Sequence, residues 1–146
     1  MPWLADTNIL VYRVDPRVAH KQERARLLLR EGLVSGEGRL SYQAIVEFVS
    51  ATSRPGRSGS PPLLTRIEAG REAEELMNQF PILYPTDGQL RLAIRGAAAY
   101  GMSWFDANMW ACAEANGLGT LYSEDFQDGR VYGHVRMVDP FREGSR

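Results

Sequence analysis

The chain has 146 residues, of which 44% are hydrophobic and 24% are charged. This profile predicts one compact globular domain and excludes a disordered tail or a fibrous repeat. The net charge of −1 excludes an overall positive field that would gather nucleic acid, so any such contact has to be local.

Cysteine content and hydropathy indicate the compartment. The single cysteine, Cys112, cannot form an internal disulfide and fits a small buried hydrophobe in a reducing environment. No stretch approaches the roughly 20 apolar residues that cross a bilayer. Asp6 would also interrupt the apolar core of a signal peptide. We therefore expect a cytoplasmic protein with no membrane contact.

The N-terminal part predicts a strand followed by helices. Residues 3–5 are an apolar run that ends at Asp6, where a helix or turn begins. Residues 20–33 carry apolar side chains at helical spacing and predict an amphipathic helix that ends near Gly36.

A helix over residues 42–51 follows Ser41, and Glu47 lies near its middle. Four apolar side chains are predicted to share one of its faces: Tyr42, Ile45, Val46 and Val49. Residues 53–62 contain only Pro, Gly, Ser and Arg, which predicts an exposed loop. It is long for a connector, so we expect it to be mobile or functional.

The middle of the chain predicts helix, strand, helix. Ser60, followed by two prolines, predicts the start of a helix that runs to about Phe80 with a break near Gly70. Residues 81–85 are a short apolar run between prolines and predict a strand. Residues 86–100 predict the next helix.

The C-terminal part completes an alternating pattern. Ser103 and Asp106 have capping-box spacing, which places Asp106 in the first turn of a helix. Residues 120–122 and 135–138 predict strands, and a polar loop over 123–129 lies between them. Strands that alternate with helices predict an α/β fold with a mainly parallel sheet covered on both faces.

Four acidic residues are candidates for one site. Asp6 ends the first predicted strand and Asp125 follows the strand at 120–122, and ligands of parallel sheets bind at this carboxyl edge. Glu47 and Asp106 lie on helices that can reach the same edge. Clustered carboxylates take up protons unless a cation neutralises them, and their hard oxygens suit Mg²⁺ or Mn²⁺.

The same residues resemble the motifs of PIN-domain nucleases. Asp-Thr-Asn-Ile-Leu-Val-Tyr at residues 6–12 resembles the opening segment of that family, and Val-Glu-Phe at 46–48 resembles the context of its second acid. Phe-Asp-Ala at 105–107 and Ser-Glu-Asp-Phe at 123–126 resemble the third acid and the closing segment. The resemblance covers residues 1–141 with all four acids in order, and the minimal size is similar to that of VapC-type toxins.

This resemblance implies a single-domain, three-layer α/β/α sandwich over residues 1–141, followed by a short tail at 142–146. It also implies a Mg²⁺- or Mn²⁺-dependent endoribonuclease that hydrolyses tRNA, rRNA or mRNA. As partners it implies a second copy of the chain in a homodimer and a cognate antitoxin, since VapC-type proteins are the toxins of toxin–antitoxin pairs.

The resemblance also assigns roles within the site. Asp6, Asp106 and Asp125 would supply most metal-binding oxygens. Glu47 would bind a second ion or orient the attacking water, and two ions would lie about 3.5 to 4 Å apart. Whether one or two ions bind is left open.

Three polar residues are expected to support the acids. Asn8 and Ser123 would hold the carboxylates in place from behind. Asp128 either adds a ligand or closes the turn before Gly129. Each acid alone also has a structural explanation, as a helix cap, a solvated helix face or a turn former. These explanations would all have to hold together for the site to be absent.

Other side chains have two interpretations. His20 and His134 show no metal-site spacing. Trp104 and Trp110 flank Asp106 at helical spacing, which favours core packing over base stacking. The arginines of the 53–62 loop are either phosphate contacts or part of a solvated linker.

Rival functions fit less well. A response-regulator receiver domain needs a lysine near its acids, and Lys21, the only lysine, lies in the first amphipathic helix. A haloacid-dehalogenase-type phosphatase needs a second aspartate where Asn8 stands. Two alternatives keep the PIN fold: an RNA-processing enzyme outside any toxin–antitoxin pair, and a module that binds RNA or protein without cleavage.

Overall fold

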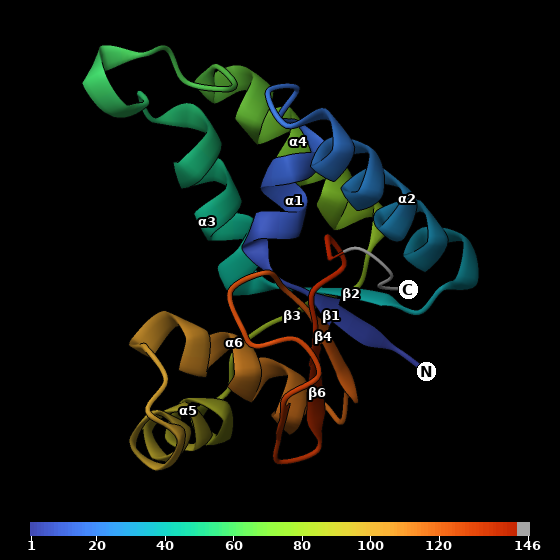
Figure 1. Ribbon diagram of the computed structural model, residues 1–146, viewed down its shortest axis with the longest axis vertical. Helices are drawn as coiled ribbons and strands as arrows, with labels where there is room; N and C mark the ends of the chain where they lie inside the picture. Colours follow the sequence, from blue (N-terminus) through green and yellow to red (C-terminus); the bar gives the residue numbers. More distant parts are fainter. Residues whose placement is uncertain (143–146) are drawn as a thin grey trace.

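A computed structural model describes residues 1–142 of the chain (Figure 1). Within the described residues, six strands form one sheet in the order β3-β2-β1-β4-β6-β5. Their bounds are β1 (Trp3–Ala5), β2 (Gly38–Ser41), β3 (Ile82–Leu83), β4 (Thr120–Tyr122), β5 (Val131–Tyr132) and β6 (Val135–Val138). Neighbouring strands run parallel except for β5, which pairs antiparallel with β6. The predicted mainly parallel sheet is confirmed.

Six α-helices cover the sheet: α1 (Thr7–Arg13), α2 (Ala19–Ser35), α3 (Tyr42–Ser53), α4 (Arg66–Gln79), α5 (Asp87–Tyr100) and α6 (Trp104–Ala115). Figure 1 shows α1 to α4 on one side of the sheet and α5 with α6 on the other. This is the predicted α/β/α sandwich. In the described residues, no helix is both long and apolar enough to cross a membrane. Most of the expected tail, residues 143–146, lies outside the described residues.

Side-chain caps set the helix starts. Ser41, Thr86 and Ser103 each accept a hydrogen bond from a backbone N–H in the first turn of α3, α5 and α6. Gly101 ends α5 in the left-handed conformation, with φ 68°. These contacts lie within three residues of the chain, which is why the sequence predicted the three helices well.

The predicted start of α4 is wrong. The helix begins at Arg66, because Thr65 and Glu68 form a reciprocal capping box, and the two prolines after Ser60 remain outside it. The helix also continues unbroken through Gly70. The loop before it is exposed as predicted and contains a short 3₁₀ turn, η1 (Arg57–Gly59).

The sequence did not predict two of the strands, β2 and β5. Of these, β2 lies beside β1 inside the sheet. Gly38 faces α2 so closely that a Cβ would lie 3.2 Å from the Cα of Gly32 and 3.0 Å from the Phe80 ring. The strand therefore needs glycine at its first position, and with Arg39 and Ser41 it lacks the apolar run expected of a buried strand. The antiparallel β5 has only two residues and was not predicted either.

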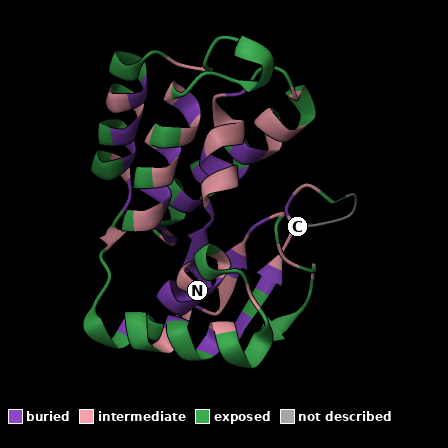
Figure 2. Cartoon of the chain, turned by 90° about the vertical axis from the view of Figure 1, so that its left-hand side faces the viewer, coloured by how far each residue is buried: buried purple, intermediate pink, exposed green. Residues whose placement is uncertain are grey.

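The buried face of α3 also differs from the prediction. Ala44, Ile45 and Phe48 face the core, whereas Tyr42 and Val46 are each 48% exposed. Figure 2 shows the buried residues concentrated where the helices meet the sheet. Cys112 belongs to this core, and burial raises the pKa of its thiol to about 12, as expected of a structural cysteine.

The sheet topology determines where a site can form. β1 pairs with β2 on one side and with β4 on the other, and Ala5 lies opposite both Leu40 and Tyr122. The chain leaves β1 toward one half of the sheet and later returns to the other half at β4. A parallel sheet has its binding crevice at such a reversal, outside the carboxyl ends of the strands. Asp6 and Ser123 are the residues that follow β1 and β4 there.

Candidate active site

Asp6 lies at the centre of this crevice and is buried. The Ser123 hydroxyl donates to its Oδ2 at 2.6 Å, and the Thr7 backbone N–H donates to its Oδ1 at 2.7 Å. Burial raises the pKa of Asp6 to about 7. The two hydrogen bonds oppose this shift, and the charges of Asp125 and Asp106 add to it. The site therefore holds a carboxyl group that is only partly ionised near neutral pH.

Asp125 is connected to Asp6 through two small polar side chains. Asn8 donates from Nδ2 to Asp125 Oδ2 at 3.1 Å and to the Ser123 hydroxyl at 3.2 Å. The Asp125 backbone N–H also donates to that hydroxyl, at 3.0 Å. Desolvation raises the pKa of Asp125, and the hydrogen bond from Asn8 lowers it. The charges of Asp106, Glu124 and Glu47 raise it further. Asn8 and Ser123 contact the acids as the sequence predicted.

Glu47 reaches the site from α3. The Thr7 hydroxyl donates to its Oε1 at 2.6 Å, and Gln43 Nε2 donates to its Oε2 at 3.0 Å. Gln43 also donates to the Phe105 carbonyl at 3.1 Å, which connects α3 to α6. Thr7 bridges two acids, through its N–H to Asp6 and its hydroxyl to Glu47. Sequence reasoning did not assign Thr7 a role, although its place beside Asp6 at a helix start was a usable signal.

Asp106 lies in the first turn of α6, as predicted, and its N–H donates to the Ser103 hydroxyl at 3.2 Å. Its charge contributes to the raised pKa of both Asp6 and Asp125. Charge interactions therefore connect Asp6 with Asp125 and Asp106, and Asp125 with Asp106 and Glu47. These four acids come from the end of β1, from α3, from α6 and from the loop after β4.

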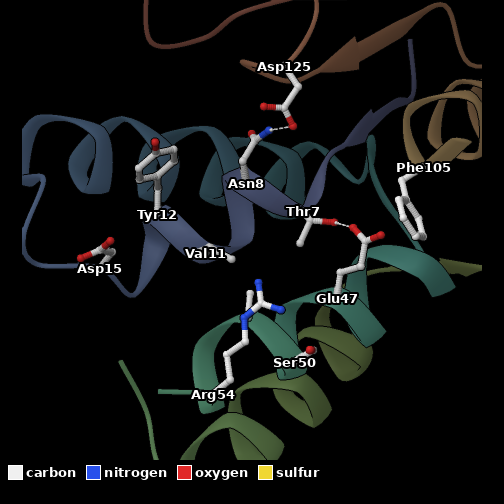
Figure 3. A pocket seen from close by; sticks show the side chains of 11 residues that line it. Thr7, Asn8, Val11, Tyr12, Asp15, Glu47, Ser50, Arg54, Phe105 and Asp125 are labelled. Atoms are coloured by element: carbon white, nitrogen blue, oxygen red, sulfur yellow. Dashed lines mark hydrogen bonds between the residues drawn. The ribbon is translucent and has the colours of Figure 1, made fainter. Parts of the chain in front are cut away.

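A cavity of about 600 Å³ opens beside these acids, between α1 and α3. Figure 3 shows Asp125 with Asn8 on one side of it and Glu47 with Thr7 on another. Arg54, at the end of α3, extends toward α1 from the same side of the cavity as Glu47. The cavity therefore contains carboxylates at the sheet edge and a guanidinium farther along the groove.

The donors fit a divalent cation, although they are not gathered into a preformed site. In residues 1–142, no three acidic, histidine or cysteine side chains lie close enough to hold a metal ion. The Thr7, Asn8 and Ser123 side chains lie between the carboxylates. The Oδ1 atom of Asn8 is buried without a hydrogen-bond partner. An unsatisfied oxygen beside carboxyl groups with raised pKa values is the donor set that Mg²⁺ or Mn²⁺ prefers.

Asp128 does not join the acids. Its Oδ1 accepts from the Asp139 backbone N–H at 2.9 Å, and its Oδ2 lies 3.7 Å from Arg142 Nε. These contacts favour the second of its two interpretations, a residue that closes the turn.

The single lysine, Lys21, lies nearer the acids than its position in the first amphipathic helix led us to expect. Lys21 Nζ lies 2.7 Å from Glu124 Oε2, and the Tyr12 hydroxyl donates to Glu124 Oε1 at 2.5 Å. Glu124 directly precedes Asp125, so α1 and α2 both hold the loop that carries this acid. The position of Lys21 therefore does not by itself argue against a receiver domain.

The two tryptophans that flank Asp106 differ. Trp110 is buried, as core packing predicted, but Trp104 is 45% exposed. Trp104 lies beside Phe105, which is 67% exposed, on the rim of a second cavity. The core prediction is therefore correct for Trp110 and wrong for Trp104.

Comparison with known proteins shows one family. The family model described as PIN domain matches residues 4–132. No curated protein sequence matches the chain significantly. Among solved structures, the DNA-bound VapBC from Salmonella typhimurium aligns with a TM-score of 0.68 at 14% identity, over 96% of this chain and 98% of that chain.

Two further solved structures have the same fold. Mycobacterium tuberculosis VapC20, described as a sarcin-ricin loop cleaving toxin, aligns with a TM-score of 0.62 at 15% identity, over 84% of this chain and 89% of that chain. VapBC-1 from nontypeable Haemophilus influenzae aligns with a TM-score of 0.61 at 17% identity, over 97% and 100%. At such identities the similarity shows the fold alone.

Proposed function

The chain belongs to the PIN-domain family, and from this membership we propose that it is a divalent-metal-dependent endoribonuclease. The observation that carries the proposal is the buried carboxyl group of Asp6 at the switch point of the sheet, with Asp125 and Asp106 close enough to raise its pKa. A buried carboxyl group beside other acids costs stability in the metal-free protein, which a purely structural role does not explain.

Each acid has a proposed role. Asp6, Asp106 and Asp125 hold Mg²⁺ or Mn²⁺, with Asn8 and Ser123 behind them. Glu47 binds a second ion or orients the attacking water. Its two bonds, from Thr7 and Gln43, support this role because they fix the direction of the carboxylate.

The reaction is hydrolysis of an RNA phosphodiester. The water oxygen bonds to phosphorus, the leaving ribose oxygen departs from the opposite side with the electron pair of its bond to phosphorus, and the configuration inverts. The attacking water gives one proton to a carboxylate, and the departing ribose oxygen takes up a proton from solvent and leaves as a hydroxyl group. A cation held by these carboxylates would neutralise their charge and would make the attacking water easier to deprotonate.

We further propose that the protein is the toxin of a toxin–antitoxin pair and works in the cytoplasm. The Salmonella neighbour is a VapBC complex, and another neighbour is a toxin–antitoxin complex from Klebsiella pneumoniae with a TM-score of 0.64 at 16% identity. Exposed apolar side chains on α2 and α4, Val34 and Ile67 among them, suit a protein partner.

A homodimer is the second proposed assembly. Five side chains line one cavity between α3, α5 and α6 and are each at least 45% exposed: Tyr42, Val46, Leu90, Trp104 and Phe105. Monomeric proteins rarely expose so many neighbouring large apolar groups. We call these five residues the α3–α5–α6 patch and propose that a second copy of the chain covers it.

Cleavage of RNA tests the enzymatic proposal. The purified protein is incubated with mixed tRNA and rRNA in Mg²⁺, Mn²⁺ or EDTA, beside Asp6→Asn and a control, Asp87→Asn. Asp87 is exposed and lies on α5, across the sheet from the groove. We expect discrete fragments that need the metal, and a loss on the order of 10²-fold or more in Asp6→Asn only.

Two results would change the proposal. A folded, inhibitor-free wild-type protein that cuts no RNA would favour the non-catalytic binding module. Cleavage by a chain whose gene has no antitoxin neighbour would favour an RNA-processing enzyme instead.

A further inference from the structure

The groove between α1 and α3 is longer than the acidic site. Thr7, Asn8 and Asp125 line its end at the sheet edge, and Arg54 lines it at the far end of α3. A second cavity, of about 320 Å³, shares Val11, Ala51 and Arg54 with the first. The two cavities therefore form one continuous groove, and Arg54 stands where they join.

Helix α3 contributes a polar stripe to this groove. Glu47, Ser50 and Arg54 all line the first cavity, at positions i, i+3 and i+7. Seven residues correspond to two helical turns, so Arg54 lies about 10 Å along the axis from Glu47. Figure 3 shows the guanidinium directed toward α1 on the same side as Glu47. The helix carries an anionic group at one end of the stripe and a cationic group at the other.

The end of the groove distant from the acids carries arginine side chains whose charge no acid neutralises among residues 1–142. Arg17, which also lines the second cavity, is already neutralised by a bidentate pair with the buried Asp15. Arg54 and Arg57 form no ion pair among residues 1–142. Both are exposed. An unpaired guanidinium beside a groove is suited to bidentate contact with a phosphate.

We propose that Arg54, with Arg57 beyond it, is a phosphate subsite that binds the RNA backbone next to the cleaved bond. The inference rests on the proposed function, because the acidic end supplies the reason for a nucleic-acid strand to lie in the groove. The net charge of −1 gives the protein no general attraction for RNA, so binding needs such a local cationic contact. Continuity with the acids favours RNA over an acidic protein segment.

Binding and cleavage of RNA test the subsite separately. In the first assay, a fluorescein-labelled single-stranded RNA of about 12 nucleotides is titrated with Asp6→Asn protein, which does not cut it, with and without Arg54→Gln. We expect Arg54→Gln to weaken binding by about 3- to 10-fold. The slope of log affinity against log salt should fall by about 0.7 in magnitude, the value for one lost contact with a single strand.

The second assay measures cleavage kinetics. In an otherwise wild-type protein, Arg54→Gln should raise KM with little change in kcat, because the contact is made equally before and during the reaction. Arg54→Lys should keep most of the salt dependence. The matched control is Arg95→Gln, which removes the same charge from an exposed position on α5, across the sheet from the groove.

The outcomes separate the two proposals. If wild-type protein cuts RNA and Arg54→Gln behaves as Arg95→Gln does, the subsite is overturned and the nuclease stands. If Arg54→Gln weakens RNA binding but no variant cuts, the subsite stands and the enzymatic proposal fails. If Arg54→Gln lowers affinity for a polyglutamate peptide and not for RNA, the groove end receives an acidic protein segment and the subsite is overturned.

Discussion

At the scale of single residues, two features of Asp6 have opposite effects on the ionisation of its carboxyl group in the metal-free protein. It caps α1 through the Thr7 N–H, which favours the ionised carboxylate, yet it is buried beside other acids, which favours the protonated form. The second effect is larger, since the pKa of Asp6 rises from 3.8 to about 7. A bound cation would remove the conflict.

This shift predicts a pH-dependent stability of the metal-free protein. Between pH 4 and 7 the folded chain holds a proton on Asp6 that the unfolded chain releases, so this group's contribution to the free energy of unfolding falls as pH rises. Asp6→Asn lacks this titration. From pH 5 to pH 8, the free energy of unfolding should change in favour of the variant by about 2–3 kcal/mol relative to wild type.

Urea unfolding in EDTA at both pH values measures this difference. Addition of Mn²⁺ at pH 8 should then stabilise wild type and not Asp6→Asn, because only the folded wild-type site binds the ion. A wild-type-to-variant difference that is the same at both pH values would contradict the raised pKa.

At the scale of elements, glycine disfavours a helix, so a glycine inside one needs an explanation. Close packing between two helices explains one such glycine and not another. Gly96 in α5 lies against Trp110 of α6, and a Cβ there would come within 2.3 Å of the indole ring. Gly70 in α4 has open space, and a Cβ there would meet no atom within 4 Å. Both lie inside helices, so they form a matched pair.

We expect opposite effects from the same substitution at these two sites. Gly96→Ala should destabilise the protein by about 1–3 kcal/mol, because the buried ring has to move. Gly70→Ala should stabilise it by about 0.5–1 kcal/mol, because alanine favours the helix and nothing obstructs it. Thermal and urea unfolding measure both. Equal effects at the two positions would show that packing between α5 and α6 is looser than described.

At the scale of the whole molecule, the α3–α5–α6 patch is an apolar surface that the fold leaves exposed. Gln43 binds Glu47 at its edge, and both side chains also line the patch cavity. Phe105 belongs to the patch and to the lining of the acidic cavity. An assembly that covers this surface would therefore lie directly beside the candidate active site.

Sedimentation velocity tests the dimer. Wild type should sediment as about twice the 16.4 kDa chain mass. Leu90→Glu should give monomers, because Leu90 is a 45% exposed residue of the patch on α5 and a buried charge is costly. Val34→Glu, at an 80% exposed position on α2, is the control and should remain dimeric. A wild-type monomer, or equal dissociation in both variants, would exclude the α3–α5–α6 patch as the interface.

The features that the sequence by itself determined are those with short-range causes. Ser41, Thr86 and Ser103 cap helices through bonds to residues three positions away, so their signals are visible in any short window. The same holds for Asp6 and Asp125, each of which follows an apolar strand. These signals were enough to predict an α/β fold with a mainly parallel sheet, and the resemblance to PIN-domain nucleases added the three-layer sandwich. The joint role of the four acids stays a prediction.

Only the tertiary structure decided the features that depend on distant neighbours. Gly38 fits in β2 with Gly32 and Phe80 close against it, and Trp110 is buried against Gly96 of α5 while Trp104 is exposed. Asp128 turns away from the acids because the Asp139 backbone holds it. Burial is a property of packing between elements, and no local pattern encodes which face of a helix its neighbours will cover.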